Sequence, residues 1–257
     1  MHKYNMEEAK KILETIATVK LQKNEANAFG LILEKTLLNK KIPLAEENNL
    51  SCFLKTNGLF EKLQSKYEIY ETNLERNYVE IITKNELLLP DNYPMYKRFR
   101  ALIKKEINLA RIDKEDKVLF IGSGPFPISA ILLNKIAGCI VDCYEKKKKS
   151  ADISREVISR LRLEDQIRII KHKGEYLNND RYSVVIIALL AKPKKEIIAR
   201  ISRKLPENIR VICRTSHGIR QAFYEPTDSR TLGSFQIIAT KYARGNQTVS
   251  SLLLKKY

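Results

Sequence analysis

Apolar residues recur at helical spacing through the first part of the chain. Ile12, Ile16 and Val19 follow one another at intervals that place them on one face of a helix. The same spacing returns between Phe29 and Leu38. Only two glycines occur before residue 112, and no segment there alternates as a half-buried strand does. Because helix breakers are so rare, we expect a helical bundle over residues 1–111.

From residue 117 onward the pattern changes to short apolar runs separated by helical segments. Lys117–Ile121 is a nearly continuous apolar run that ends in a glycine-rich turn. This pattern is typical of a buried strand in a parallel sheet. The expected strands span residues 117–121, 139–144, 167–170, 183–188, 210–214, 235–240 and 249–254, and the expected helices span 128–137, 151–162 and 194–204. This alternation predicts a doubly wound, Rossmann-like α/β domain over residues 112–257. The last two strands have no helix between them, which predicts a terminal antiparallel hairpin.

The chain is strongly basic, with a formal net charge of +17 and a pI near 9.6. A basic surface can attract nucleic acid or an anionic membrane. The lysines, however, are spread along the whole chain, and no tryptophan is present. We therefore do not expect a nucleic-acid partner from charge alone. No apolar stretch reaches the length of about 18 residues that a membrane span needs, and the charged start lacks the apolar region of a secretory signal. These features predict a soluble, cytoplasmic protein.

Neither cysteines nor histidines form a metal-binding or disulfide pattern. Cys139 and Cys143 lie in an expected strand, where a spacing of four residues separates them by roughly 13 Å, too far for a disulfide. The cysteines are interpreted as reduced core residues. His2, His172 and His217 are scattered along the chain, and we expect no metal cofactor.

The loop of residues 122–127, with the sequence GSGPFP, follows the first expected strand. Gly122 and Gly124 allow a sharp turn and let a ligand approach the backbone. Pro125 and Pro127 each remove an N–H that a pyrophosphate would need at a helix start. This argues against NAD and favours a nucleoside ligand without phosphate, such as S-adenosylmethionine. The alternative is a purely structural strand-to-helix turn. The candidate cofactor-binding residues of this loop are Gly122, Ser123, Gly124, Pro125 and Phe126.

Glu145 directly follows the second expected strand. A carboxylate at this place can accept both hydroxyls of a ribose, as a nucleoside site requires. The alternative is a solvated glutamate before the lysine run of residues 146–149. That run could instead bind the 2′-phosphate of NADP, but the two prolines of the loop argue against it.

Four further motifs accompany the loop. They are LERNY at residues 74–78, YPMY at 93–96, ALLAKPK at 188–194 and RTSHGIR at 214–220. Together with FIGSGPFP at residues 120–127, they resemble the nicotianamine synthase family, including its archaeal members and the bacterial enzymes that make staphylopine-type metallophores. The resemblance covers roughly Leu74 to Leu254. The expected terminal hairpin agrees with this resemblance, because methyltransferase-type sheets characteristically end in an antiparallel hairpin.

The resemblance implies a particular reaction of S-adenosylmethionine. This family transfers the 3-amino-3-carboxypropyl (aminobutanoate) arm to an amine acceptor, releases methylthioadenosine and builds a nicotianamine-like metal chelator. By resemblance, Glu75 is the general base and Tyr96 holds the amine or relays its proton. Tyr93 is then a substrate-binding residue and Ala188 a cofactor-binding residue. Residues 1–111 would supply the acceptor side and a lid, contributing Glu75 and Tyr96, and residues 112–257 would bind S-adenosylmethionine.

Two residues of the RTSHGIR motif are candidates for binding the acceptor. A guanidinium such as that of Arg214 suits a substrate carboxylate, although an exposed basic residue after a strand is the alternative. His217 either contacts the acceptor or caps its loop. Ser216 and His217 stand where archaeal relatives carry Tyr and Thr. His172 and Lys173 stand where many S-adenosylmethionine folds place an acidic residue for adenine, so adenine is expected to be held mainly by backbone groups and by the loop before Tyr182.

Two other functions compete with the aminobutanoate transferase. The first is an S-adenosylmethionine-dependent methyltransferase, for which the basic charge suggests RNA as substrate. The [DN]-P-P-[YF] motif of amino-methylating enzymes is absent from the sequence. The second is a nucleic-acid-binding protein on an inactive fold, against which the Glu75 and Tyr96 motifs argue. The acceptor amino acid and the number of units added stay open, and a homodimer is a possible assembly.

Overall fold

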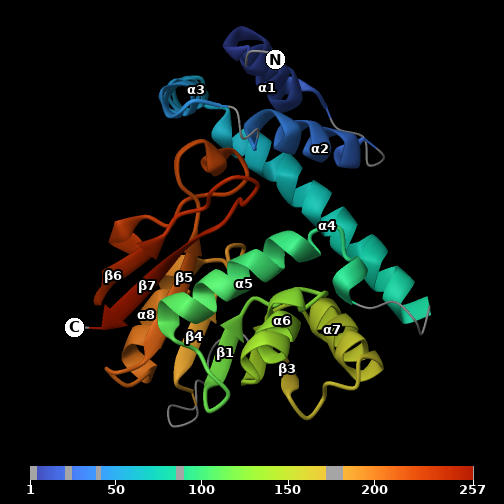
Figure 1. Cartoon of the computed structure of the whole chain (residues 1–257), viewed down its shortest axis with the longest axis vertical. Helices are drawn as coiled ribbons and strands as arrows, with labels where there is room; N and C mark the ends of the chain where they lie inside the picture. Colours follow the sequence, from blue (N-terminus) through green and yellow to red (C-terminus); the bar gives the residue numbers. More distant parts are fainter. Residues whose placement is uncertain (1–4, 21–24, 39–41, 85–89, 172–181, 257) are drawn as a thin grey trace. The chain divides into compact units, whose positions relative to one another are not determined.

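A computed structural model describes residues 5–20, 25–38, 42–84, 90–171 and 182–256 (Figure 1). The chain divides into two compact units. Unit 1 comprises Met1–Leu74, Thr215–Pro226 and Tyr242–Ser250, and unit 2 comprises Glu75–Arg214, Thr227–Lys241 and Ser251–Tyr257. The predicted boundary between residues 111 and 112 falls inside unit 2. That residues 1–111 and 112–257 are separate domains stays a prediction.

Unit 1 is helical, as the apolar spacing predicts. It contains α1 (Met6–Thr18), α2 (Ala26–Leu37), α3 (Leu44–Thr56) and the first part of α4 (Phe60–Lys84). Fully buried leucines of these helices, such as Leu13, Leu33 and Leu50, form its core. The side chain of Asn5 caps α1 by accepting the N–H of Glu8.

Two segments from late in the sequence complete unit 1. The first contains the short 3₁₀ helix η3 (Gly218–Ala222). Phe223, just after η3, packs edge-on against Tyr67 of α4, with 4.7 Å between ring centroids. Gln64 of α4 donates to the carbonyl of Gln221 at 2.7 Å. The Arg220 guanidinium donates to carbonyl groups of the second segment, Tyr242–Ser250. Ring packing and a hydrogen bond therefore hold the first segment to α4, and hydrogen bonds from Arg220 hold the second segment to the first.

Unit 2 is built on a seven-stranded sheet with the order β3-β2-β1-β4-β5-β7-β6. The strands are β1 (Lys117–Ile121), β2 (Ile140–Glu145), β3 (Ile167–Lys171), β4 (Val184–Ile187), β5 (Arg210–Thr215), β6 (Phe235–Lys241) and β7 (Ser250–Lys256). The four neighbouring pairs among β1–β5 are parallel. β6 and β7 are antiparallel. The predicted Rossmann-like sheet and its terminal antiparallel pair are therefore confirmed.

Helices cover the sheet of unit 2. They are α5 (Tyr96–Ala110), α6 (Ile128–Ala137), α7 (Lys148–Arg160) and α8 (Lys194–Lys204), with the short 3₁₀ helices η1 (Pro90–Asn92) and η4 (Ser229–Thr231). Figure 1 shows α5, α6 and α7 together over one face of the sheet. α6 is apolar nearly all round and buries its whole stretch from Ile128 to Leu133, so it lies against both α5 and the sheet.

The cysteines follow the prediction except at one position. Cys139, Cys143 and Cys213 are buried free thiols, whereas Cys52 is free but exposed. Burial raises the pKa of the Cys139 thiol to about 11, so this group is uncharged at neutral pH.

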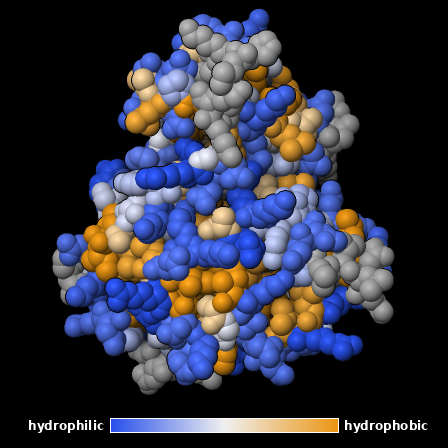
Figure 2. All heavy atoms as spheres, in the orientation of Figure 1, coloured by the Kyte–Doolittle hydropathy of each residue, from blue (hydrophilic) through white to orange (hydrophobic). Residues whose placement is uncertain are grey.

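The visible surface is mostly hydrophilic, interrupted by apolar patches (Figure 2). In unit 2, exposed apolar side chains include Ile237 and Ile238 on the edge strand β6. A register shift between Ile237 and Ala239 bends this edge. None of the helices within the described ranges is long and apolar enough to cross a membrane.

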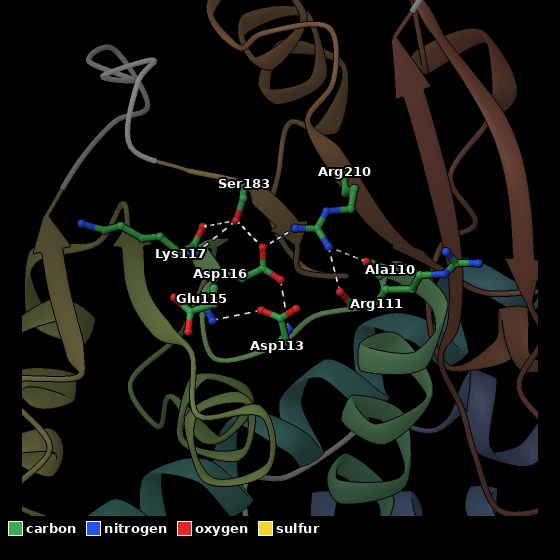
Figure 3. Close-up of polar contacts among 8 residues, drawn as sticks. All are labelled: Ala110, Arg111, Asp113, Glu115, Asp116, Lys117, Ser183 and Arg210. Atoms are coloured by element: carbon green, nitrogen blue, oxygen red, sulfur yellow. Dashed lines mark hydrogen bonds and ion pairs between the residues drawn. The ribbon is translucent and has the colours of Figure 1, made fainter.

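A polar network fixes the amino ends of three strands (Figure 3). Asp116, just before β1, accepts hydrogen bonds from the Ser183 hydroxyl at 2.6 Å and from the Arg210 guanidinium. Arg210 also donates to the carbonyl oxygens of Ala110 and Arg111 at the end of α5. Ligands of parallel α/β sheets bind at the opposite, carboxyl edge. The network of Asp116, Ser183 and Arg210 therefore serves the fold.

Asp116→Asn should lower the free energy of unfolding at pH 7 by about 1.5–3 kcal/mol, the usual contribution of hydrogen bonds to a charged group. Burial by itself would raise the pKa of Asp116, but bonds from Ser183, the Asp113 backbone and Arg210 outweigh it and lower the pKa. A lowered pKa stabilises the fold above the ordinary Asp value of 3.8, and this stabilisation is lost as pH falls through the lowered value. Urea unfolding at pH 7 and at a pH below 3.8 measures this change in stability.

The matched control is Glu115→Gln, because the Glu115 side chain is 82% exposed. It should change stability by less than about 0.5 kcal/mol. An Asp116→Asn chain as stable as the unmodified chain at pH 7 would contradict the structural role of the network.

Candidate active site

The loop of residues 122–127 leaves the carboxyl end of β1 and leads into α6. Gly122 has φ +86°, in the region that favours glycine, and its N–H donates to the carbonyl of Tyr144 at 2.8 Å. A Cβ on Gly122 would lie 3.0 Å from the Cβ of Ala191 and 3.3 Å from that of Ala188. Both the backbone conformation and the close approach therefore require glycine here. The predicted residue Ala188 lies against the loop.

Gly122→Ala should lower the free energy of unfolding by about 2–5 kcal/mol, because left-handed strain adds to overpacking against Ala191. Gly233→Ala separates the two effects. Gly233 has φ +58°, but a Cβ there would meet no atom of the described ranges within 4 Å. Its replacement should cost only about 1–2 kcal/mol. Thermal unfolding measures both losses. Equal losses of unfolding free energy in the two variants would show that crowding against Ala191 does not destabilise Gly122→Ala.

Glu145 accepts hydrogen bonds from the loop and from the segment that leads into α7. It ends β2, whose register with β1 pairs Tyr144 with Ile121, so the two strand ends lie side by side. The buried carboxylate accepts the Gly124 N–H at 3.0 Å through Oε2 and the Lys147 N–H at 2.8 Å through Oε1. Each carboxylate oxygen can accept a further hydrogen bond. The arrangement supports a hydroxyl-binding role for Glu145, which stays a prediction.

The middle of the loop fits a polar ligand. Ser123 is 9% exposed, and its hydroxyl has no hydrogen-bond partner in the described part of the chain apart from a weak interaction with the Cys143 thiol. Gly124 has φ +70°, and among the described residues a Cβ there would meet only the Oε2 atom of Glu75 within 4 Å. An unsatisfied buried hydroxyl is costly unless something binds it. The loop therefore presents a polar group and open backbone to a ligand.

Glu75 lies at this loop, as the motif resemblance predicts. It belongs to α4, and its Oε2 is 3.5 Å from the place that a Cβ of Gly124 would occupy. The side chain is only partly buried. The structure thus brings together the predicted base and the predicted cofactor loop, although 47 positions or more separate them along the chain.

An aromatic cluster of Tyr78, Tyr93 and Phe126 lies where α4 meets the loop. The ring of Phe126 lies 5.0 Å from that of Tyr78 and 4.9 Å from that of Tyr93. All three side chains are buried. Tyr78 is one helical turn after Glu75, so packing of the cluster holds this turn of α4 against the loop. Phe126 and Tyr93 were predicted as ligand contacts, and that role stays a prediction.

Burial of the Tyr78 hydroxyl raises its pKa to about 12; nearby Asp91 adds to this effect and a hydrogen bond from the Asn92 backbone opposes it. Tyr78 is therefore protonated at neutral pH. Its spacing of three residues from Glu75 was the signal that could have marked it as part of the site.

The hydroxyl of Tyr96 has other partners. Tyr96 begins α5, and the ammonium of Lys135 lies 5.9 Å from the centroid of its ring. Lys135 pairs with Asp91 at 3.0 Å. A hydrogen bond from Lys135 lowers the pKa of Asp91, and one from Tyr96 contributes. The structure therefore groups the Tyr96 hydroxyl with a surface ion pair, whereas Glu75 and the aromatic cluster gather at the loop.

Arg214 lies at the carboxyl end of β5 and is buried together with Glu106 of α5. Its guanidinium binds both carboxylate oxygens of Glu106, at 2.9 and 2.8 Å. Nothing in the sequence marked Glu106, since it lies 108 positions away from Arg214. The predicted carboxylate-binding residue thus already binds a carboxylate of the chain itself.

His217 belongs to unit 1, where it precedes η3. Its side chain makes no capping hydrogen bond to η3 and is exposed, with its ring 4.7 Å from that of Tyr242. The neighbouring Ser216 is buried and donates to the carbonyl of Tyr224 at 2.5 Å. Contact of His217 with an acceptor stays a prediction. His172, Lys173 and the rest of the loop before Tyr182 lie outside the described residues, as does His2.

Comparison with known proteins agrees with these motifs. The family model described as "Nicotianamine synthase protein" matches residues 8–257. The L-histidine 2-aminobutanoyltransferase of Yersinia pestis is 27% identical over 128 residues, which are 50% of this chain and 48% of that protein. Nicotianamine synthase 2 of Arabidopsis thaliana is 27% identical over 177 residues, 64% of this chain and 55% of that protein. The chain spans about half the length of these curated relatives.

Two solved structures show the fold. The crystal structure of a mutant of MtNAS in complex with S-adenosylmethionine has a TM-score of 0.86 and 22% identity, covering 98% of this chain and 97% of that one. The mitomycin 7-O-methyltransferase MmcR has a TM-score of 0.53 and 13% identity, covering 95% of this chain and 75% of that one. The predicted fold, a helical part followed by a Rossmann-like sheet, is confirmed. Because the family model spans nearly the whole sequence, the chain belongs to the nicotianamine synthase family.

Proposed function

We propose that this protein transfers the 3-amino-3-carboxypropyl arm of S-adenosylmethionine to an amine acceptor and releases methylthioadenosine. One observation carries the proposal beyond family membership. The carboxylate of Glu75 lies at Gly124, in the loop whose buried Ser123 hydroxyl, together with the buried Glu145 carboxylate at the end of β2, suits a nucleoside ligand. A site for a base and a site for a sulfonium nucleoside therefore coincide.

The proposed reaction is a displacement at carbon. The acceptor nitrogen attacks the carbon of the aminobutanoate arm that is bonded to sulfur, so an N–C bond forms and the C–S bond breaks. The electron pair of that bond goes to sulfur, and the neutral thioether methylthioadenosine leaves. The proton lost by the acceptor amine goes to the carboxylate of Glu75. All three carbons on the sulfonium are electrophilic, so positioning decides which one reacts.

The other residues hold the two substrates. Ser123 and the open backbone at Gly124 contact S-adenosylmethionine, and Glu145 accepts the ribose hydroxyls. Tyr93 contacts Phe126 of the loop, and Ala188 lies against Gly122. For Tyr96 to hold the amine or relay its proton, its hydroxyl would have to leave Asp91. For His217, contact with the acceptor stays a proposal. An amino acid is the expected acceptor, because the aminobutanoyltransferase relatives are named for one.

The product is a nicotianamine-like metal chelator, and the reaction needs no metal in the protein. Within the described ranges, His, Cys, Asp and Glu form no group of three that could hold a metal ion. The four free cysteines fit the reducing conditions of the cytoplasm, which is the proposed location. The proposal needs no membrane or nucleic acid and does not depend on whether the chain forms a homodimer.

One assay tests the reaction. The protein is incubated with S-adenosylmethionine and single amino acids, and the nucleoside product is identified by mass spectrometry. Methylthioadenosine, together with an acceptor heavier by one aminobutanoate unit, is the expected result. S-adenosylhomocysteine would mean methyl transfer and would contradict the proposal. The mass of the second product also gives the acceptor and the number of units added.

Glu145→Gln should weaken binding of S-adenosylmethionine by about 10- to 100-fold, since hydrogen bonds to a charged acceptor contribute about 1.5–3 kcal/mol. Isothermal titration calorimetry measures the change directly. Glu156→Gln is the control, because Glu156 is half-exposed on α7 and forms an ion pair with Arg160 at 3.6 Å. Unchanged binding by Glu145→Gln would remove Glu145 from the nucleoside site.

A further inference from the structure

A buried ion pair lies beside the proposed site. Arg214 is 4% exposed, and Glu106 is 0% exposed. Nε and one Nη of the guanidinium donate to the two oxygens of the carboxylate, at 2.9 and 2.8 Å. The guanidinium carbon also lies 5.1 Å from the ring centroid of Phe120 in β1. Two-point pairing in a desolvated place fixes the geometry of both side chains.

Two buried serines each form a hydrogen bond to one member of this ion pair. The other Nη of Arg214 donates to the hydroxyl oxygen of Ser129 at 3.0 Å. The hydroxyl of Ser251 donates to Glu106 Oε1 at 2.8 Å. Ser129 is the second residue of α6 and therefore stands two positions after Pro127, the last residue of the loop. Ser251 belongs to β7. Of the two serines, Ser129 is the one that lies next to the cofactor loop.

We infer that Arg214 is a positioning residue, which holds the cofactor loop through Ser129, and that it does not bind a substrate carboxylate. If the guanidinium turned to a substrate, the Glu106 carboxylate would stay buried without its counter-charge. The backbone of Arg214 is fixed as well, since its carbonyl accepts a hydrogen bond from Lys194 at 2.8 Å. The inference rests on the proposed function, because it assigns S-adenosylmethionine to the loop.

The ion pair ties three elements to one point at the carboxyl edge of the sheet. β5 supplies Arg214, α5 supplies Glu106 and α6 supplies Ser129. In the register of the sheet, Cys213 of β5 pairs with Ile187, the last residue of β4. Arg214 is therefore level with Ala188, which packs against Gly122. A shift at Ser129 moves the loop, and with it the groups that bind the nucleoside.

Ser129→Ala and Ser251→Ala form a matched pair of variants. Each removes one buried hydroxyl from the same ion pair, and only the first removes the link to the loop. Ser129→Ala should raise both the KM and the Kd for S-adenosylmethionine about tenfold, while kcat changes by less than about threefold. Ser251→Ala should leave KM within about twofold. Equal effects of the two variants on KM would overturn the inference.

Arg214→Lys tests the alternative role of the guanidinium. Lysine keeps the charge but loses the two-point pairing, so the KM for S-adenosylmethionine should rise about 10- to 100-fold with the KM for the acceptor unchanged. A rise confined to the acceptor KM would assign Arg214 to a substrate carboxylate and overturn the inference. Calorimetric binding of S-adenosylmethionine separates the two proposals. It tests positioning by Ser129 even in a chain that releases no methylthioadenosine, in which case only the proposed function fails.

Discussion

Replacing Glu75 by Gln should lower the rate of methylthioadenosine release by about 10²- to 10⁴-fold, the usual contribution of a general base. The amide keeps the size of the side chain and its place at Gly124, where the carboxylate oxygen now lies. It cannot take the proton that the acceptor amine must lose. Binding of S-adenosylmethionine should stay within about threefold of the unmodified chain. Single-turnover product release and calorimetric binding measure the two quantities separately.

Glu80→Gln is the matched control for this experiment. Glu80 lies on the same helix α4 but is 59% exposed and pairs with Lys84. Its replacement should leave turnover within about twofold. Undiminished turnover of Glu75→Gln would show that another group accepts the proton. Loss of S-adenosylmethionine binding by Glu75→Gln would instead assign Glu75 to binding.

Most of the sheet could be predicted because its strands are buried on both faces. Lys117–Ile121 reads as a continuous apolar run, and the structure has β1 over the same residues. The beginning of α7 was less predictable. The sequence places it near Ala151, whereas the helix begins at Lys148, after the extended residue Lys147. Nothing in a run of lysines resembles a helix N-cap, so the sequence carries no signal for that boundary.

The parts of the site that follow strand ends could also be predicted. Gly122 directly follows β1 and Glu145 ends the neighbouring parallel strand β2, so their closeness follows from the topology. Partners brought together by packing alone could not be found this way. Ser129 and Ser251 lie 85 positions from Arg214 and 145 positions from Glu106, respectively. A buried glutamate on a helix has the same local pattern as a surface one, so Glu106 gave no signal.

Removing either half of the buried ion pair alone should lower the free energy of unfolding by about 3–5 kcal/mol. Glu106→Leu leaves a guanidinium that is 4% exposed without its carboxylate, and Arg214→Met leaves a carboxylate that is 0% exposed without its guanidinium. In both cases the remaining charge keeps its desolvation penalty and loses its compensation. Denaturant unfolding of the two single variants measures these losses.

The double variant, Glu106→Leu with Arg214→Met, should be far more stable than the sum of the two single losses predicts, because it buries no charge. A small loss remains, since Ser129 and Ser251 each lose a hydrogen-bond partner. Additive losses would mean that the two charges do not interact across the pair. Stability and loop positioning separate in this same variant. Its stability should recover, but its KM for S-adenosylmethionine should stay raised, because methionine cannot donate to Ser129 and the loop loses its link to β5.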